Sequence, residues 1–386
     1  MIRLILLTDF TEAFAHNLLR GILEYSKSRE PWVVCRMPPS YKHAYGISGV
    51  LKWAQKWEAD AIIAQFNDGD DVEQFRRQGI VALAQDFKSR FSVIPNITSE
   101  YKLTGRMAAD FFLQKGFKHF AFYGYENVVW SAERCMGFRD RIREKGYGDN
   151  FYEYQKQPLE SLWFYESRPL VDWLKKLPRP VALMTCDDTQ GNKIIEVCRV
   201  SGIEIPEEIA VLGVDNDEVI CGLSNPSLSS VNLNIVKGGY EAAALIDSLV
   251  QNRDMPYEDV VIHPTTIIER ISTDIYSTDD PDILTALKYI HQNLANKIHV
   301  KDVVRQVPLS RRLLEIRFRQ VVGKSVYQYV LDLRMERFSQ LLLASNEPIS
   351  GVALEVGLSD CKNLARQFKL WKGCTPIEYR MQNRVK

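Results

Sequence analysis

The chain has 386 residues, enough for two or three globular units. With 46% hydrophobic and 25% charged residues, its composition is that of a folded protein and excludes a disordered or fibrous one. The net charge of zero conceals an asymmetry: residues 281–386 hold 18 lysines and arginines against 9 acidic residues, whereas the rest holds 31 against 40. We therefore expect only the basic tail to meet a polyanion.

Residues 1–276 alternate between short apolar runs and longer amphipathic stretches, the pattern of a parallel sheet with helices on both faces. The runs expected to form strands are residues 4–7, 61–64, 81–84, 119–123, 181–185, 209–214 and 260–263. The stretches expected to form helices are residues 13–28, 101–115, 132–145, 170–177, 189–201 and 235–252.

After a short polar segment, residues 272–280, the strand signal ends. Residues 277–386 are therefore expected to be a separate, all-α domain. Its expected helices are residues 282–294, 300–306, 311–321, 326–343, 349–356 and 360–370.

The tail repeats itself. Phe318, Gly323 and Tyr329 recur 50 residues later as Phe368, Gly373 and Tyr379. Residues 300–319 and 349–370 each predict a helix-turn-helix. Gly357 suits a turn that needs positive φ. The side chains expected to be buried are Leu314, Phe318, Leu364 and Phe368.

The second repeat reads Ser359-x4-Leu364-x3-Phe368-Lys369-x3-Gly373-x-Thr375-Pro376-x2-Tyr379-Arg380. This duplicated pattern, in a basic region of about 100 residues, resembles the carboxyl-terminal signature of the AraC family of transcription regulators. The resemblance implies two recognition helices that enter successive major grooves of double-stranded DNA. The alternative is an ordinary solvated surface of charged helices.

Outward-facing side chains of the two recognition helices are the candidates for DNA contact. Those expected to contact bases are Arg312, Glu315, Ile316, Lys362, Asn363 and Arg366. Ile316 offers only an apolar contact, so it could read only a thymine methyl or DNA shape. The residues expected to contact phosphates are Arg311, Arg319, Lys324, Lys369, Lys372 and Arg380.

Several segments of residues 1–276 resemble the periplasmic-binding-protein-like effector domain of LacI-type regulators. They include Glu133-Arg134-x2-Gly137-Phe138-Arg139, Cys186-Asp187-Asp188-Thr189-Gln190-Gly191 and Leu212-Gly213-Val214-Asp215-Asn216. The resemblance implies a type I fold, with two α/β lobes that cross near residues 95–100, 231–234 and 265–268. A ligand would bind between the lobes, at the carboxyl ends of the strands, where Gln85 and Asp86 also lie.

Sugar recognition needs donors and acceptors for hydroxyl groups and an aromatic face for the ring. We expect Asp187 and Asp215 to accept from hydroxyls, Arg134 to donate, and Phe10 or Trp130 to stack. The full candidate set is Asp9, Phe10, Gln65, Trp130, Arg134, Asp187, Asp215 and Asn216. Alternatively, an aspartate after a strand only caps the next helix, as Asp188 or Asp217 could do, and Arg134 pairs with Glu133 at the surface.

The order of the two modules resembles that of the xylose-operon regulators, which makes xylose the leading effector. We expect a sugar-responsive DNA-binding regulator that works as a homodimer, with RNA polymerase as a further candidate partner. Activation is the expected mode, and repression is the alternative that the sequence leaves open. One alternative is that residues 1–276 are only a dimerisation scaffold. Another is a sugar-modifying enzyme, but the chain has no G-x-S-x-G, no phosphate-binding loop and no histidine pair for a metal.

Localisation is expected to be cytoplasmic and nucleoid-associated, with no membrane contact. No run of about 18 apolar residues could span a bilayer, and the apolar amino terminus is too short for a signal peptide. The seven cysteines are dispersed without disulfide or metal-ligand spacing, as is typical of reduced thiols. No cofactor, metal site or catalytic residue is expected.

Overall fold

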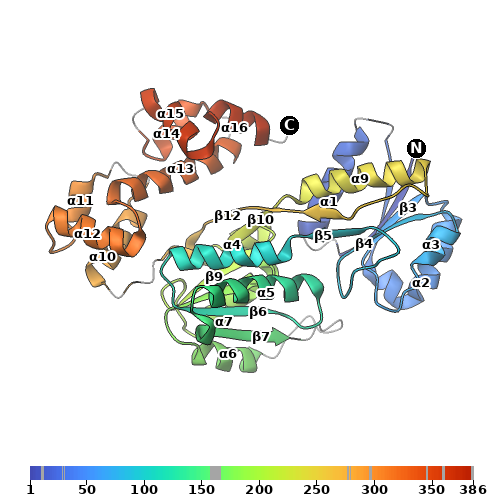
Figure 1. Ribbon diagram of the computed structural model, residues 1–386, viewed down its shortest axis with the longest axis horizontal. Helices are drawn as coiled ribbons and strands as arrows, with labels where there is room; N and C mark the ends of the chain where they lie inside the picture. Colours follow the sequence, from blue (N-terminus) through green and yellow to red (C-terminus); the bar gives the residue numbers. More distant parts are fainter. Residues whose placement is uncertain are drawn as a thin grey trace. The chain divides into compact units, whose positions relative to one another are not determined.

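A computed structural model describes residues 1–9, 13–27, 29, 31–156, 167–275, 278, 280–294, 298–344, 347–358 and 361–383. The chain forms two compact units, the first of Met1–Leu113 and Lys118–Asp274 and the second of Ile275–Lys386 with Gln114–Phe117 (Figure 1). The first unit is an α/β structure and the second is helical, as expected. Among the described residues, no helix is long and apolar enough to cross a membrane.

The first unit contains two six-stranded sheets. The first sheet is parallel throughout, in the order β11-β5-β4-β3-β1-β2. Its strands are β1 (Arg3–Leu7), β2 (Val33–Met37), β3 (Ala61–Ala64), β4 (Val81–Gln85), β5 (Asn96–Ser99) and β11 (Val260–Ile262). Every residue of β3, β4 and β5 is buried, because helices cover both faces of the sheet.

The second sheet has the order β12-β10-β9-β8-β6-β7, with β12 antiparallel to β10 and the other pairs parallel. Its strands are β6 (His119–Tyr125), β7 (Phe151–Lys156), β8 (Val181–Thr185), β9 (Ile209–Val214), β10 (Ser229–Leu233) and β12 (Pro264–Ile268). Each sheet with its helices is called a lobe below.

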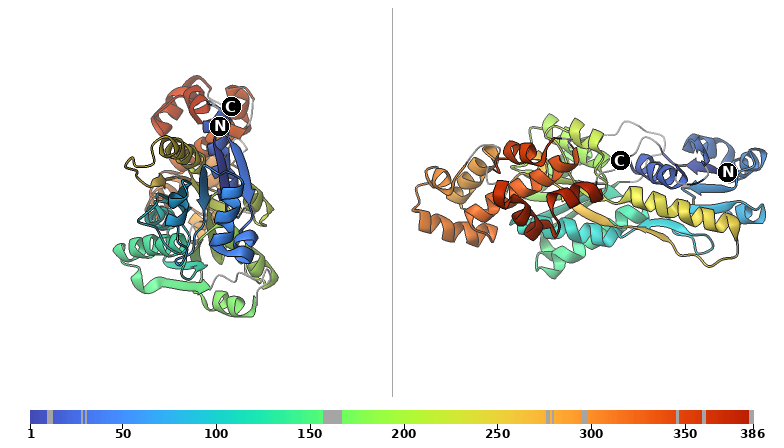
Figure 2. Two further views of the ribbon diagram at one scale, coloured as in Figure 1. Left: turned by 90° about the vertical axis from the view of Figure 1, so that its right-hand side faces the viewer. Right: turned by 90° about the horizontal axis from the view of Figure 1, so that it is seen from above.

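The helices of the first lobe pack on both faces of its sheet (Figure 2). They are α1 (Ala13–Lys27), α2 (Pro39–Lys56), α3 (Glu73–Arg77) and α9 (Ile235–Gln251). The helices of the second lobe are α4 (Tyr101–Gln114), α5 (Val129–Glu144), α6 (Ser167–Lys176), α7 (Asp188–Val200) and α8 (Glu218–Leu223). Short 3₁₀ turns lie at Gly148–Asn150 and Ile271–Thr273.

The chain passes between the lobes three times. It passes after β5 into α4, after β10 into α9, and at His263 between β11 and β12. The passages are joined to one another, since Glu100 N donates to the Ile262 carbonyl and Asn234 N to the His263 carbonyl, each over 3.0 Å. The third passage precedes the expected segment 265–268, which instead pairs with β10 as part of β12.

Each of the seven expected strands is present, within two residues at either end. The sequence pattern does not predict β2 or β7, because these edge strands are only partly buried and mix polar with apolar residues. It also does not predict α2, where Gly46 has a φ of 64° and interrupts the helical periodicity.

The second unit has seven helices among the described residues: α10 (Pro281–Gln292), α11 (Val300–Val304), α12 (Arg311–Val322), α13 (Val326–Ala344), α14 (Ile349–Glu355), α15 (Cys361–Lys372) and α16 (Pro376–Asn383). They surround two separate apolar cores. The amino-terminal half of α13 packs in the first core and its carboxyl-terminal half in the second. Helix α13 therefore joins two similar helix-turn-helix repeats within the second unit.

The repeat in the sequence is a repeat in space. Gly323 and Gly373 have φ values of 78° and 84°, so both end their helices in the left-handed region that favours glycine. The ring centroids of Phe318 and Tyr329 are 5.6 Å apart, and those of Phe368 and Tyr379 are 5.5 Å apart. Gly357 also has the positive φ that its turn predicts.

Candidate functional site

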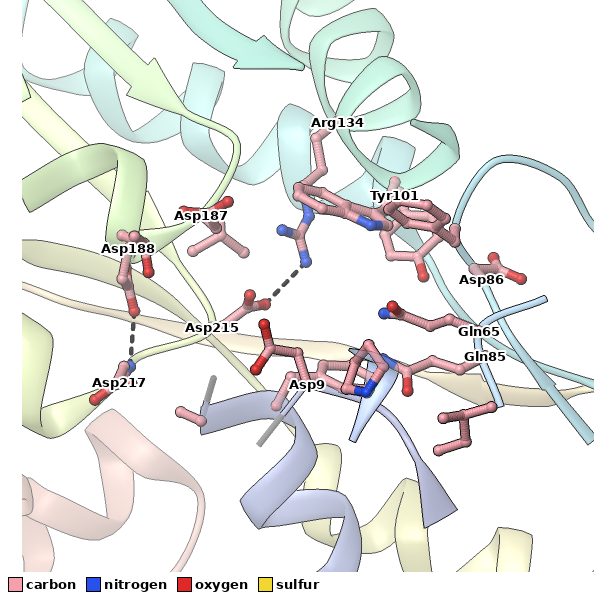
Figure 3. Close-up of a pocket in the computed structure, with 18 of the residues that line it drawn as sticks. Asp9, Gln65, Gln85, Asp86, Tyr101, Arg134, Asp187, Asp188, Asp215 and Asp217 are labelled. Atoms are coloured by element: carbon pink, nitrogen blue, oxygen red, sulfur yellow. Dashed lines mark hydrogen bonds and ion pairs between the residues drawn. The ribbon is translucent and has the colours of Figure 1, made fainter. Parts of the chain in front are cut away.

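A cavity of about 250 Å³ lies between the two lobes of the first unit, at the carboxyl ends of their strands (Figure 3). This is where open parallel sheets bind ligands, and the volume suits a small metabolite. The first lobe contributes Leu7, Asp9, Ala13, Phe14, Pro39, Lys42, His43, Gln65, Asn67, Gln85, Asp86 and Phe87. The second contributes Tyr101, Trp130, Arg134, Asp187, Asp188, Thr189, Val214, Asp215 and Asp217.

Arg134 is the central cation on the second lobe's side of the cavity. Helix α5 carries it, and its side chain is only 3% exposed. Its guanidinium donates to Asp215 Oδ1 over 2.9 Å and to the Cys186 carbonyl. It also lies 5.4 Å from the ring centroids of both Tyr101 and Trp130. Burial is the largest single influence and lowers the pKa of Arg134, but the combined charge interactions with Asp215, Tyr101, Cys186 and Asp187 outweigh it and the pKa is raised.

The turn after β9 directs Asp215 toward Arg134. Asp215 and Asn216 have φ values of 97° and 51°, in a region that residues other than glycine rarely adopt. Asp215 N donates to the Val231 carbonyl over 2.9 Å, and Asn216 Oδ1 accepts from Arg270 over 2.8 Å. These bonds hold a strained turn in place, so the direction of the Asp215 carboxylate is set by the fold.

Three further carboxylates surround the ends of β8 and β9. Asp187 caps α7 by accepting from Gln190 N over 2.7 Å, and Asp217 caps α8. Asp188 accepts from the Ser230 hydroxyl over 2.6 Å. It also accepts from Asp217 N over 2.7 Å (Figure 3). Burial raises the pKa of Asp187 and raises that of Asp188 well above its ordinary value. Asp187 therefore combines a capping role with a place in the cavity wall.

Two residues of the cavity wall each keep one buried polar atom without a hydrogen-bond partner among the described residues. Asp86 is 2% exposed, and its Oδ2 accepts from the Thr98 hydroxyl over 2.6 Å and from Arg90 over 3.0 Å. Its Oδ1 has no partner, and neither has Nε of Arg134. Each such atom costs about 1–3 kcal/mol. Both atoms are covered by protein, so they are unsatisfied groups inside the cavity wall and not contact points on its surface.

The helices that carry Tyr101 and Arg134 touch backbone to backbone. A Cβ on Gly105 of α4 would lie 2.1 Å from the Arg134 carbonyl oxygen, and one on Gly137 of α5 would lie 2.0 Å from the Lys102 carbonyl oxygen. Any side chain at either position must push the helices apart. The glycines therefore set how far Arg134 reaches into the cavity.

The substitution Gly105→Ala is expected to destabilise the first unit by about 1–3 kcal/mol, because it overpacks the contact between α4 and α5. It should also weaken ligand binding, because Arg134 moves with α5. Gly222→Ala in α8 is the matched control, since a Cβ there meets nothing within 4 Å. Thermal denaturation and calorimetric titration measure the two effects, and equal behaviour of both variants would contradict the expectation.

The substitution Asp188→Asn is expected to flatten the pH dependence of stability. The raised pKa means that the native state binds a proton more tightly than the unfolded chain, whose aspartates titrate near pH 4. That contribution is present at low pH and is lost as the pH rises through the native pKa. The wild type should therefore lose more unfolding free energy than the variant as the pH rises above about 4, where unfolded aspartates titrate. Urea titrations, with exposed Asp172→Asn as control, measure this loss.

The structure gathers most of the predicted effector residues around the cavity. Those that line it are Asp9, Gln65, Trp130, Arg134, Asp187 and Asp215. Phe10 lies outside the described residues. Asn216 is not among the described residues of the cavity wall, because it bonds to Arg270 and its backbone N donates to the Ser230 hydroxyl. The left-handed turn therefore directs the side chains of Asp215 and Asn216 to different partners.

Lys42, Asp86 and Tyr101 also line the cavity, although they are not in the predicted set. Asp86 directly follows β4, so its position after a predicted strand could have identified it from the sequence. Lys42 lies on α2, which the pattern does not predict, and it bonds to the Gln65 carbonyl over 3.0 Å and to Asp70 over 2.5 Å. Tyr101 follows β5, at a passage between the lobes.

In the second unit, α12 and α15 bury the predicted side chains and expose their other faces. The buried residues are Leu314, Phe318, Leu364 and Phe368. Of the predicted base-contacting residues, those exposed are Arg312, Ile316, Asn363 and Arg366. Glu315 is half-buried, and its Oε2 accepts from Val326 N over 3.3 Å at the start of α13. The Lys362 side chain lies outside the described residues.

The predicted phosphate-contacting residues differ in their partners. Arg311, Arg319 and Lys369 are exposed. Lys324 pairs with Asp332 over 2.6 Å, and the Lys372 ammonium lies 4.6 Å from the Trp371 ring centroid. Arg380 donates to the carbonyls of Leu342 and Glu347, each over 2.9 Å. Lys324 and Arg380 thus stabilise the fold, and their contact with phosphates stays a prediction.

Two family models match the chain. A periplasmic binding protein-like domain matches residues 109–273, and a helix-turn-helix domain matches residues 303–382. Together with the cavity between the lobes and the duplicated helical unit, these matches define a class. The protein is a DNA-binding transcription regulator in which a periplasmic-binding-protein-like domain precedes an AraC-type domain.

Relatives extend over nearly the whole chain. The xylose operon regulatory protein of Haemophilus influenzae is 30% identical over 332 residues, which are 83% of this chain and 85% of that protein. Its counterpart in Escherichia coli K12 is 28% identical over 393 residues, 99% and 97% of the two chains. The solved structure of a xylose-binding transcription activator is 26% identical, with a TM-score of 0.61 and coverage of 99% and 98%. The chain belongs to the family of xylose operon regulatory proteins.

Proposed function

We propose that the cavity binds a neutral monosaccharide, with xylose as the leading candidate, and that this binding controls transcription of sugar-utilisation genes. The names of the relatives support xylose. The chemistry of the wall supports a polyol, since carboxylates from both lobes can accept from hydroxyls. Trp130 and Tyr101 offer aromatic faces to a sugar ring. The many carboxylates disfavour an anionic sugar such as a sugar phosphate.

The observation that carries this proposal is that both lobes supply polar side chains to one cavity, Asp9 and Gln65 from the first lobe and Arg134, Asp187 and Asp215 from the second. The carboxylates can accept from sugar hydroxyls and the arginine can donate to a sugar oxygen. A ligand that bonds to both lobes favours the arrangement in which they are close together. It shifts the equilibrium only by its differential affinity for that arrangement.

Contacts across the cleft are available to stabilise the same arrangement. Arg90, after β4, donates two bonds to the Glu133 carboxylate on α5, over 2.8 and 2.9 Å. Val129 N donates to the Phe87 carbonyl over 2.8 Å. Glu133 therefore pairs across the cleft with Arg90, whereas its neighbour Arg134 pairs with Asp215 inside the second lobe. Without a ligand, these contacts and the three passages between the lobes are what favour the closed arrangement.

The readout that we propose is DNA binding by a homodimer. Two copies would present their helix-turn-helix units to a symmetric or direct-repeat site, as oligomeric regulators commonly do. The regulator would then recruit RNA polymerase as an activator. Because this work is done on the chromosome, we place the protein in the cytoplasm, at the nucleoid.

Titration calorimetry with D-xylose, other pentoses, hexoses and xylose 5-phosphate tests the proposed effector. We expect saturable binding of one neutral sugar, and loss of it in Asp215→Asn, while Asp172→Asn on the surface of α6 is unaffected. DNA binding that ignores every sugar would favour a dimerisation scaffold instead. Turnover of the sugar by the purified protein would favour an enzyme.

The substitution Arg366→Ala is expected to weaken specific DNA binding by about 1–3 kcal/mol and to relax the preference at one base pair, because arginine pairs bidentately with guanine. Exposed Arg366 lies on the outer face of α15. Selection of binding sites from random duplexes measures the preference. Arg305→Ala, an exposed residue that follows α11, is the control. An unchanged footprint and base preference would count against the assignment of Arg366.

A further inference from the structure

Two large apolar side chains lie exposed on the outer face of α12. Leu313 is 44% exposed and Ile316 is 46% exposed. They are three residues apart, so they lie next to each other on the helix surface. The buried face of the same helix is formed by Leu314 and Phe318, which are 0% exposed. The core of the first helix-turn-helix is therefore filled without Leu313 and Ile316.

The second helix-turn-helix shows which kind of residue usually holds these positions in this chain. The two helix-turn-helix repeats align with an offset of 50 residues. The glycines that end α12 and α15, and the aromatic pairs of the two repeats, have the same geometry. Leu313 and Ile316 are thus equivalent to Asn363 and Arg366 of α15. The side chains of Asn and Arg are those that read adenine and guanine by bidentate hydrogen bonds. On α12 the equivalent side chains, Leu313 and Ile316, are hydrocarbon and cannot form hydrogen bonds with bases.

The polar neighbours of the apolar pair are held by the fold. Glu315 accepts from Val326 N at the start of α13. Arg317 pairs with Asp280 over 2.5 Å and with Asp282 over 3.1 Å, at the first turn of α10. The outer face of α12 therefore presents Leu313 and Ile316 at its centre, with the exposed polar residues Arg312, Arg319 and Gln320 around them.

We propose that, in the DNA site bound by each copy of the protein, α12 reads one half by apolar contact with thymine methyl groups, through Leu313 and Ile316. Helix α15 reads the other half of that site by hydrogen bonds. This inference rests on the proposed DNA-binding function. Thymine carries the only methyl group in the major groove of unmodified DNA, and an apolar side chain against it is a known form of base readout. Cationic Arg311, Arg312 and Arg319 surround the pair, as a surface that meets DNA requires.

The α12 half-site should accordingly contain A·T pairs where the apolar side chains meet the groove, and Arg312 should add one polar contact at its edge. The two half-sites of one operator would then differ in base composition, even though the two helical units share one fold. Because the two half-sites would not be interchangeable, the duplicated domain would bind the DNA in one orientation only.

Replacement of thymine by deoxyuracil tests this, because it removes only the methyl group. The operator is first selected from random duplexes by the full-length protein, and Arg366→Ala marks the α15 half by its relaxed base preference. Uracil in the other half is expected to weaken wild-type binding about fourfold for each methyl that Leu313 or Ile316 contacts. Uracil in the α15 half should change the affinity much less.

The double variant Leu313→Ala/Ile316→Ala should bind more weakly and no longer respond to uracil in the α12 half. A wild-type affinity that is insensitive to uracil there, or a double variant that keeps the wild-type sensitivity, would overturn the inference. So would loss of dimer in sedimentation without any effect of uracil, since the pair would then bind a second copy. Absence of any preferred operator would instead sink the proposed function itself.

Discussion

Replacing Arg134 by methionine is expected to lower the affinity for the sugar at least tenfold and to destabilise the first unit. Methionine keeps much of the volume but removes the donors to Asp215 Oδ1 and to the Cys186 carbonyl. Loss of a hydrogen bond to a charged group costs about 1.5–3 kcal/mol, and breaking a buried ion pair costs about 3–5 kcal/mol. Calorimetric titration measures the affinity, and urea denaturation measures the stability.

The structure offers a matched control on the same helix. Arg143 of α5 is exposed and lies 4.0 Å from Asp140, so Arg143→Met should leave both quantities nearly unchanged. Arg134→Lys should be intermediate, because lysine keeps the charge but lacks the planar fork of donors that bonds to Asp215 and the Cys186 carbonyl. If Arg134→Met binds the sugar like the wild type, the cavity is not the effector site.

Replacing Phe368 by alanine is expected to unfold the second helix-turn-helix while the first remains folded. Phe368 is fully buried and packs against Phe338 and Tyr379, with ring centroids 5.5 Å apart in each case. Truncation of a buried phenylalanine costs about 3–5 kcal/mol. Because the two cores are separate, that loss falls on one of them. Specific DNA binding should then fall to what one recognition helix supports.

Hydrogen exchange of the full-length protein locates the damage. In Phe368→Ala, amides of α14 to α16 should lose protection while those of α10 to α12 keep it, and Phe318→Ala should show the reverse. Leu370→Ala is the surface control, since that side chain is 81% exposed. Loss of protection across all helices in either variant would mean that α13 makes the two halves a single cooperative unit.

The strands and helices that could be predicted are those with strong burial patterns. β3, β4, β8 and β9 are buried at every residue and are bordered by polar turns, so local sequence suffices for them. The edge strands β2 and β7 and the kinked helix α2 depend on neighbours that are distant in sequence. Their local patterns are weak because only part of each element faces a core.

Some residues of the candidate site could likewise be predicted from the local sequence, and others could not. Arg134, Asp187 and Asp215 could be predicted because each belongs to a motif or follows a strand. Asn216 belongs to such a motif too, yet a left-handed turn takes its side chain to Arg270 instead. Lys42 has no local signal, because only the packing of α2 on the first sheet brings it to the cavity.

The amino-acid sequence by itself determined the class of protein, since a duplicated helical motif and an alternating α/β pattern are both local and periodic. It also determined which faces of α12 and α15 are buried. Tertiary structure decided the rest: that Asp86 keeps a buried oxygen without a partner among the described residues, that Glu315 and Arg380 bond within the fold, and that Leu313 and Ile316 stay exposed. A side chain's partner depends on residues far away in the chain, and periodicity carries no information about them.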